Sequence, residues 1–136
     1  MELRAEILLP GNAVTGACLA LTAPISFWGG VDPASGAIID ARHPERGQNI
    51  AGRILALPGT IGSSSASAVL LELVHAGKAP AALLMDAPDA ILLLGLVVAR
   101  EMGWPTPPAL RLPAADQGAL ADRRIAISAE GLITAA

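Results

Sequence analysis

The sequence predicts a single compact α/β domain, in which early hairpins are followed by helices that alternate with short strands. The length of 136 residues suits one hydrophobic core and leaves little room for a second. Apolar residues alternate near the N-terminus, as they do in strands, whereas two later segments repeat their apolar residues at helical spacing. The pattern alone does not give the order of the strands in the sheet.

The first third of the chain is predicted to be β-structure joined by turns. Residues 3–9 alternate and end at Pro10-Gly11, and residues 16–21 look like the partner strand of this first one. Residues 24–36 contain too many glycines and prolines for regular structure, so they form a shaped loop that holds two of the three aromatic residues. Residues 37–40 are predicted to leave this loop as a short strand.

The middle of the chain is predicted to be a strand, a loop and a helix, followed by a second strand and helix. Residues 50–57 form the first strand, and a helix follows that begins near Ser65 and stops at Gly77. Residues 81–85 form a short buried strand. The helix predicted over residues 90–102 is apolar all round, which indicates deep burial.

The last part of the chain is predicted to return to strands. Three prolines rule out a helix over residues 105–108, and residues 109–112 follow as one more strand. A short helix is expected within residues 114–123. Residues 124–128 and 132–134 flank a turn and form a closing hairpin.

Composition and charge exclude several classes of protein. The chain is 53% hydrophobic and only 15% charged, so part of its apolar surface is expected to lie in an interface. The longest apolar stretch, residues 90–99, is half of the roughly 20 residues that a membrane span needs, and no secretory signal is present, so we expect a cytoplasmic protein. A net charge of -3 without a basic cluster argues against nucleic acid.

Cysteine usage limits the metal chemistry of this chain. Cys18 is the single cysteine, so neither an internal disulfide nor a site built from several thiolates can form within the chain. We therefore predict no metal ligands here.

The most informative segment is residues 59–67, rich in glycine and serine, between a predicted strand and a predicted helix. A helix N-terminus carries roughly half a positive charge, and its free N–H groups suit a carboxylate or a phosphate. Serines here also have a simpler role as helix caps, although one side chain is enough for a cap. The segment lacks the lysine of a phosphate-binding P-loop and the glycine spacing of a dinucleotide site.

The two histidines do not make a convincing serine hydrolase. His75 lies about 15 Å along the same helix from the serines and suits the negative C-terminal end. The position of His43 relative to Ser63 does not follow from the sequence. Asp32 and Asp40 are explained by a turn and a strand end. The residues by themselves therefore indicate a domain that binds an anion or forms an interface.

Two motifs carry a resemblance to a known family. Residues 24–33, which are Pro-Ile-Ser-Phe-Trp-Gly-Gly-Val-Asp-Pro, and residues 62–65, which are Gly-Ser-Ser-Ser, resemble the swivel domain of the aconitase X family. The resemblance covers most of residues 5–112. It implies a swivelling β/β/α fold and assigns residues 1–136 to one domain, the small subunit.

The resemblance also implies a function and a partner. Family members dehydrate small hydroxy acids, and the motif that contains Trp28 favours cis-3-hydroxy-L-proline, converted to 1-pyrroline-2-carboxylate, as the substrate. The expected partner is the large aconitase X subunit, in a heterodimer or a higher oligomer, and its cysteines hold the iron-sulfur cluster. Alternatives are a phosphomevalonate dehydratase small subunit and a non-catalytic domain that binds a partner.

The resemblance implies which residues form the site. In aconitase-like enzymes the base is a serine directly after a glycine, and Ser63 matches, although the sequence does not decide between Ser63 and Ser65. Aconitase has an arginine at the position of Ser65, so a cation of the large subunit is expected to replace that arginine. An isopropylmalate isomerase-like subunit would also be expected to have this arginine, so its absence argues against that alternative. The residues implied to contact substrate are Gly62, Ser64, Ser65, Ser26, Phe27, Gly30, Val31 and Asp32.

Overall fold

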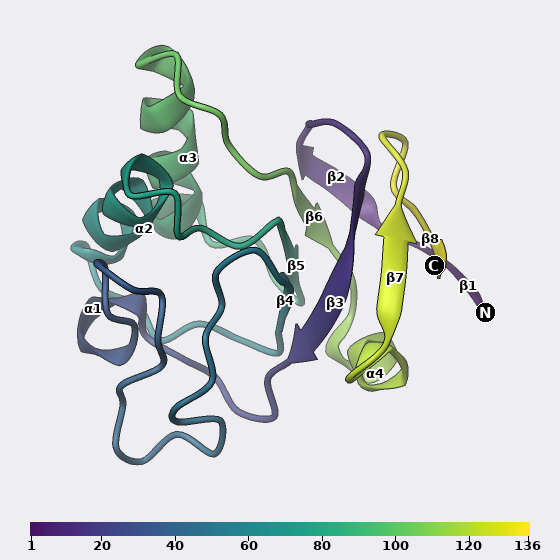
Figure 1. The fold of residues 1–136 in the computed structure, drawn as a ribbon, viewed down its shortest axis with the longest axis horizontal. Coiled ribbons are helices and arrows are strands. Elements are labelled where there is room, and N and C mark those ends of the chain that lie inside the picture. The colour runs from purple at the N-terminus through teal and green to yellow at the C-terminus, as the bar shows by residue number, and fades with distance from the viewer.

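The computed structural model describes all 136 residues, which form one mixed eight-stranded sheet with helices against it (Figure 1). The strands are β1 (Glu2–Arg4), β2 (Glu6–Leu9), β3 (Val14–Ala20), β4 (Ile54–Leu57), β5 (Ala82–Met85), β6 (Ala109–Arg111), β7 (Arg124–Ile127) and β8 (Leu132–Ala135). The helices are α1 (Phe27–Gly30), α2 (Ala66–His75), α3 (Ala90–Glu101) and α4 (Ala114–Gln117), with a 3₁₀ turn η1 (Gly118–Leu120) after α4. The strand order is β1-β8-β7-β3-β4-β5-β6-β2.

The sheet curls until its two edges meet at the N-terminus. β1 and β2 lie at opposite ends of the strand order, yet only Ala5 separates them in the chain. The Ala5 N–H donates to the Gly131 carbonyl at 2.9 Å, which joins this bend to the turn before β8. Gly131 has a φ of +93°, and a Cβ there would lie 2.5 Å from the Ala5 oxygen, so a glycine is required.

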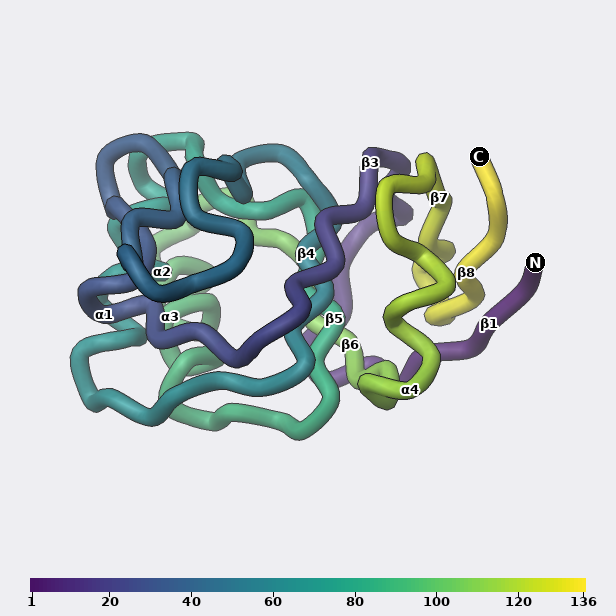
Figure 2. The backbone as a smooth tube through the Cα atoms, turned by 90° about the horizontal axis from the view of Figure 1, so that it is seen from below, coloured from purple at the N-terminus to yellow at the C-terminus, as the bar shows by residue number.

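Three layers follow from this arrangement, as Figures 1 and 2 show. The parallel strands β3, β4, β5 and β6 form the central layer, the antiparallel strands β7, β8 and β1 continue from β3 on one side, and α1, α2 and α3 cover the other side. One core lies between the helices and the central strands, and a second fills the curled sheet. All residues of β4 and β5 are buried, as expected for strands packed on both faces. The predicted α/β fold is confirmed.

The predicted strands differ from the structure in three ways. Residues 3–9, predicted as one strand, form β1 and β2, which Ala5 separates. β3 does not pair with β2; it pairs with β4 and β7, while β2 pairs with β6. The predicted strand at residues 37–40 is wrong as well, because only isolated bridges form there, between Val31 and Ile38 and between Ala37 and Asn49. Alternation in a sequence indicates an extended segment, but it shows neither the partner of that segment nor a break within it.

The expectation that α3 is buried all round is also wrong. Leu92, Gly95, Leu96 and Ala99 face α2 and the core, whereas Ile91, Leu94 and Val97 are 47%, 51% and 40% exposed. No helix in the structure has both the length and the apolarity to cross a membrane. No other part of the chain buries the apolar outer face of α3.

α2 and α3 approach each other closely at Gly95. A Cβ at this position would lie 2.5 Å from the Ser67 carbonyl oxygen, in the first turn of α2. The contact therefore fixes the start of α2 against α3.

Gln117 ties the ends of two strands together, a role that no sequence pattern indicated. Its side chain is buried, and its Nε2 donates to the carbonyls of Leu57 at 2.9 Å and Leu112 at 3.0 Å. Leu57 is the last residue of β4, where the glycine- and serine-rich segment begins. Gln117 therefore holds the base of that segment.

Candidate functional site

The segment after β4, residues 58–65, is named the serine loop from here on. It lies at the carboxyl ends of the parallel strands, beside the turn that follows β5. Ligands commonly bind in the crevice at this edge of a parallel sheet. The Thr60 hydroxyl donates to the Asp89 carboxylate at 2.7 Å, and Asp89 also accepts from the Leu92 N–H at 3.1 Å as the cap of α3. The serine loop is thereby anchored to the start of α3.

The serine loop also pairs with the loop that contains the aromatic motif. The Ile25 N–H donates to the Gly59 carbonyl at 3.3 Å, and the Ile61 N–H donates to the Ile25 carbonyl at 3.0 Å. This parallel bridge brings together the two motifs that were singled out in the sequence, although more than 30 residues separate residue 28 from residue 63. Sequence spacing gave no indication of this contact.

Ser63 lies just before α2 and takes part in its first turn. Its Oγ accepts from the Ser65 N–H at 3.2 Å, and its carbonyl accepts from the Ala66 N–H at 3.1 Å. Ser65, which precedes the helix directly, makes no side-chain cap. Ser63 is half-buried, and the Ser65 N–H donates to its hydroxyl oxygen, which favours a partial negative charge on that oxygen.

Several N–H groups close to Ser63 in the chain have no partner in the protein. The amides of Gly62, Ser63 and Ser64, and those of Ser67 and Ala68 in the first turn of α2, have no acceptor in the protein. Ser67 and Ala68 lie in the first turn of a ten-residue helix, whose N-terminal end carries a partial positive charge. The arrangement suits an anion such as a carboxylate.

An open hollow adjoins the loop and has a volume of about 440 Å³. It is lined by the serine loop and by the turn between β5 and α3, with Gly62 and Ile91 among the lining residues. Its two carboxylates already have partners, since Asp86 accepts from the Ala114 N–H at 2.8 Å and Asp89 caps α3. The hollow therefore reaches Gly62, the residue before Ser63, and each of its two carboxylates accepts a backbone N–H.

Neither histidine activates Ser63. His43 is buried, its Nε2 lies 3.1 Å from the Ala23 carbonyl, and its Nδ1 accepts from the Glu45 N–H at 3.1 Å. Both ring nitrogens are therefore occupied by the backbone. His75 is at the far end of α2, and its ring lies 4.6 Å from that of Trp104. A serine hydrolase triad does not form in this chain.

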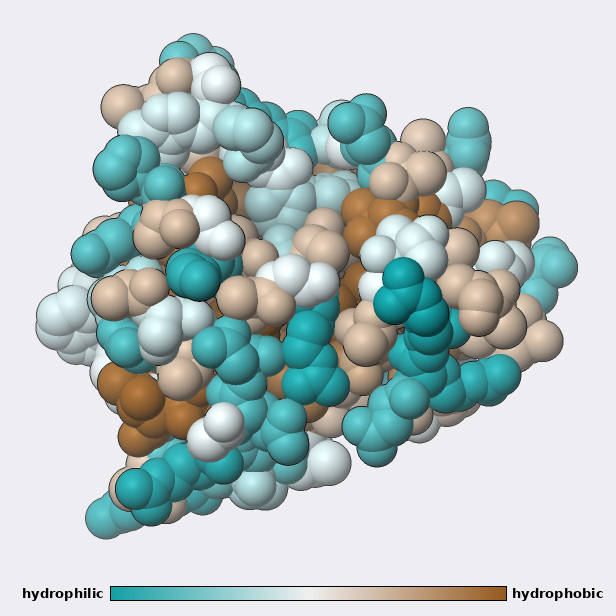
Figure 3. Space-filling view, viewed as in Figure 1, coloured by the Kyte–Doolittle hydropathy of each residue, from teal (hydrophilic) through white to brown (hydrophobic).

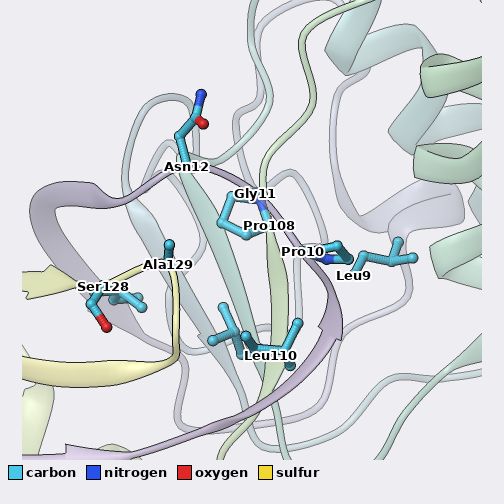
Figure 4. Close-up of a pocket in the computed structure, with 10 residues that line it drawn as sticks. Leu9, Pro10, Gly11, Asn12, Pro108, Leu110, Ser128 and Ala129 are labelled. Atoms are coloured by element: carbon cyan, nitrogen blue, oxygen red, sulfur yellow. The ribbon is translucent and has the colours of Figure 1, made fainter.

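A second hollow, shown in Figure 4, lies at the opposite edge of the central strands. It is formed by the turns beside β2, β6 and β7, and its volume of about 10 Å³ has room for about one water molecule. Figure 4 shows the polar ends of Asn12 and Ser128 directed away from Pro108 and Leu110. A substrate does not fit there.

Comparison with known proteins decides the family. The family model for the aconitase X swivel domain matches residues 2–134. The chain belongs to the aconitase X swivel-domain family. The crystal structure of Thermococcus kodakaraensis aconitase X in its holo-form has the same fold, with a TM-score of 0.85 and 28% identity, and the match covers 100% of this chain and 98% of that one. The swivelling β/β/α prediction is thus confirmed.

Two curated relatives are informative for this aconitase X domain. A cis-3-hydroxy-L-proline dehydratase from Pseudomonas aeruginosa is 49% identical over 102 residues, which are 72% of this chain and 18% of that protein. A phosphomevalonate dehydratase small subunit from Thermococcus gammatolerans is 40% identical over 99 residues, 73% of this chain and 75% of that subunit. The chain spans about a fifth of the length of the Pseudomonas dehydratase.

Some of the residues implied to contact substrate are exposed in this aconitase X domain, whereas others are buried in its core. Gly62 and Ser64 are exposed and Ser65 is half-buried, all beside the free amides. Phe27 and Val31 have buried side chains that pack in the core, and Gly30 is buried against Ile25, so these three residues support the loop. Contact of their backbones with a substrate stays a prediction.

Ser26 and Asp32 have local partners. The Ser26 hydroxyl donates to the Trp28 carbonyl at 3.0 Å. Asp32 accepts from the Ser35 hydroxyl at 2.7 Å and from the Ala34 N–H at 3.2 Å, and these two bonds hold the pKa of its carboxyl below the ordinary value. Trp28 itself is 61% exposed, and Figure 3 shows apolar residues at the surface where α1 lies. The exposure of Trp28 leaves it free to contact a ligand or another chain.

The residues of this chain do not fit an iron-sulfur cluster. Cys18 lies in β3 with its side chain inside the curled sheet, and burial raises the pKa of its thiol to about 11 from 9.0. No three His, Cys, Asp or Glu side chains come together to hold a metal ion. A neutral, enclosed thiol is a core residue and not a ligand.

The raised pKa of Cys18 predicts a loss of stability in alkali. The fold favours the neutral thiol, so this contribution is complete below pH 9 and is lost as the pH rises from 9 towards 11. At pH 10 the expected loss is about 1.4 kcal/mol of unfolding free energy. Urea unfolding at pH 8 and pH 10 measures it, and Cys18→Ala is the control, because the alanine variant should lose less. An equal loss in both proteins would contradict the assignment.

Proposed function

We propose that this chain is the small-subunit part of an aconitase X dehydratase and that Ser63 is its general base. The observation that supports the proposal is the position of the Ser63 hydroxyl among free amides at the start of α2. A bound carboxylate would accept from these amides and from the helix end, which would place the carbon next to it close to Ser63 Oγ.

The reaction that we propose starts at the carbon bearing the carboxylate. Ser63, as the alkoxide, would take the proton from this carbon, and the electron pair left behind would form a double bond to the next carbon. The hydroxyl on that next carbon would leave as water after an acid of the partner protonates it. A serine alkoxide is a strong base that water would protonate, so its charge needs stabilising donors. The Ser65 N–H already donates to Ser63 Oγ at 3.2 Å and would bond the charged form more strongly.

The remaining groups of the reaction would come from a partner. Neither the serine loop nor the lining of the hollow beside it contains a lysine, an arginine or a histidine. We propose that the large aconitase X subunit supplies these groups together with the iron-sulfur cluster. Family membership and the small-subunit name of the Thermococcus gammatolerans relative support such a division. We also propose that the pair works in the cytoplasm.

We propose cis-3-hydroxy-L-proline as the substrate. A relative that carries this dehydratase name is 49% identical, compared with 40% for the phosphomevalonate dehydratase small subunit. The ring carboxylate would bind the amides, and proton loss at C2 with departure of the C3 hydroxyl would give an enamine that tautomerises to 1-pyrroline-2-carboxylate.

Phosphomevalonate is the second candidate substrate, because the phosphomevalonate dehydratase small subunit is similar in length to this chain. This chain and the Thermococcus gammatolerans small subunit match over 73% and 75% of their lengths, whereas the Pseudomonas protein is much longer than the match.

Parallel assays decide between these substrates. The chain is mixed anaerobically with the large aconitase X subunit of the same organism, and water loss from each compound is followed. We expect turnover of cis-3-hydroxy-L-proline only in the mixture. Turnover of phosphomevalonate alone would replace the first substrate with the second, and turnover of neither would reject the proposed function.

A further inference from the structure

An uncovered apolar surface runs from the serine loop along α3. We name Ile61, Ile91, Leu94 and Val97 the apolar band; each is between 40% and 55% exposed. Successive members on α3 are three residues apart and so are neighbours on the helix surface. Single exposed apolar side chains are ordinary, whereas a contiguous row marks an interaction surface.

The apolar band starts at the candidate site itself. Ile61 directly precedes Gly62, and Ile91 and Gly62 line the same hollow. The hydrogen bond of 2.7 Å between Thr60 and Asp89 keeps the serine loop against the start of α3. A chain that reaches over Ser63 to complete the site therefore also meets the band.

The lengths of the relatives indicate what covers the band. In two dehydratases that are 49% and 42% identical to this chain, the matched region is only 18% and 19% of the polypeptide, so most of each protein is further chain. The reaction proposed above needs a cation, and neither the serine loop nor the lining of the hollow contains a lysine, an arginine or a histidine. The large remaining part of such an enzyme would therefore lie against the serine loop and the apolar band.

We propose that the apolar band is the docking surface for the large subunit. The outer face of α3 would pack against that subunit. This inference rests on the proposed function and adds the surface through which the two parts associate. Burial of the band would explain why α3 is apolar on the face that the chain leaves exposed. It would also close the hollow beside Ser63 from the α3 side.

Substitutions in the band test this proposal. Leu94→Asp and Val97→Asp would each place a charge in an apolar interface, and we expect affinity for the large subunit to fall by about 30-fold or more. The matched control is Ile7→Asp, an exposed apolar residue of the edge strand β2, where a charge is tolerated. Affinity is measured by calorimetry with the purified large subunit, and melting curves verify that each variant is folded.

The outcomes separate the docking surface from the proposed function. Unchanged affinity of folded Leu94→Asp and Val97→Asp would overturn the docking surface and leave the function standing. Failure of the unaltered chain to bind the large subunit would overturn both. A wild-type dimer of this chain alone that Leu94→Asp dissociates, with docking unaffected, would assign the band to a second copy instead. Ser63→Ala should dock as tightly as the wild type.

Discussion

Ser63→Ala should lower dehydration by the assembled enzyme by about 10³-fold or more, because it removes the group that takes the substrate proton. Alanine keeps the backbone amides and the end of α2, so substrate should still bind. The loss should therefore appear mainly in kcat and much less in KM. Initial rates over a range of substrate concentrations measure both.

Ser128→Ala is the matched control for this substitution. The Ser128 hydroxyl accepts from the Leu132 N–H at 3.0 Å, much as Ser63 Oγ accepts from the Ser65 N–H, but it lies in the closing hairpin. Each variant loses one hydroxyl acceptor, at about 1 kcal/mol, so their stabilities should change alike. Full activity of Ser63→Ala would make this serine a cap only. If Ser65→Ala abolishes activity in its place, Ser65 is the base.

Gly95→Ala should destabilise the domain by about 2–3 kcal/mol, against the ordinary preference of helices for alanine. In a helix interior alanine is favoured over glycine by about 1 kcal/mol. Here the added Cβ would lie 2.5 Å from the Ser67 carbonyl oxygen, and a backbone atom cannot rotate away as a side chain can. Overpacking of this kind costs about 1–3 kcal/mol and sometimes more, so the clash should outweigh the gain.

Gly118→Ala is the control, because a Cβ at Gly118 meets nothing within 4 Å. Urea unfolding should show a large loss for Gly95→Ala and a change close to zero for Gly118→Ala. Activity of Gly95→Ala should fall as well, because Ser67 belongs to the turn of α2 that holds the serine loop in place. A Gly95→Ala domain as stable as the wild type would mean that α2 and α3 separate at little cost.

Local patterns predicted the helices and most strands well. The helical spacing after Ser65 and the stop at Gly77 gave α2 to within a residue or two, because a buried stripe and a glycine terminus are local features. The closing hairpin followed in the same way from Gly131, which the structure gives a φ of +93°. Such elements depend on neighbours in sequence.

The partners of the strands and the exposed face of α3 could not be predicted from the sequence of one chain. β3 has its partners in β4 and β7, far along the sequence, and alternation in a strand is the same whichever strand lies beside it. The two motifs that resemble aconitase X indicated the serine loop, but the bridge that joins Ile25 to Thr60 forms only in the fold. The apolarity of α3 was visible in the sequence, whereas its open face was not.

The two chain ends lie close together beside the antiparallel strands, and this limits where a linker to another domain can start. Glu2 pairs with Thr134 across β1 and β8, so the two termini leave the molecule on the side away from the helices, as Figure 2 shows. A tether at either terminus would start from the same place and leave α2, α3 and the serine loop free. Fusion in either gene order, or a circular permutation that joins the two ends, is therefore compatible with a domain that pivots about its tether.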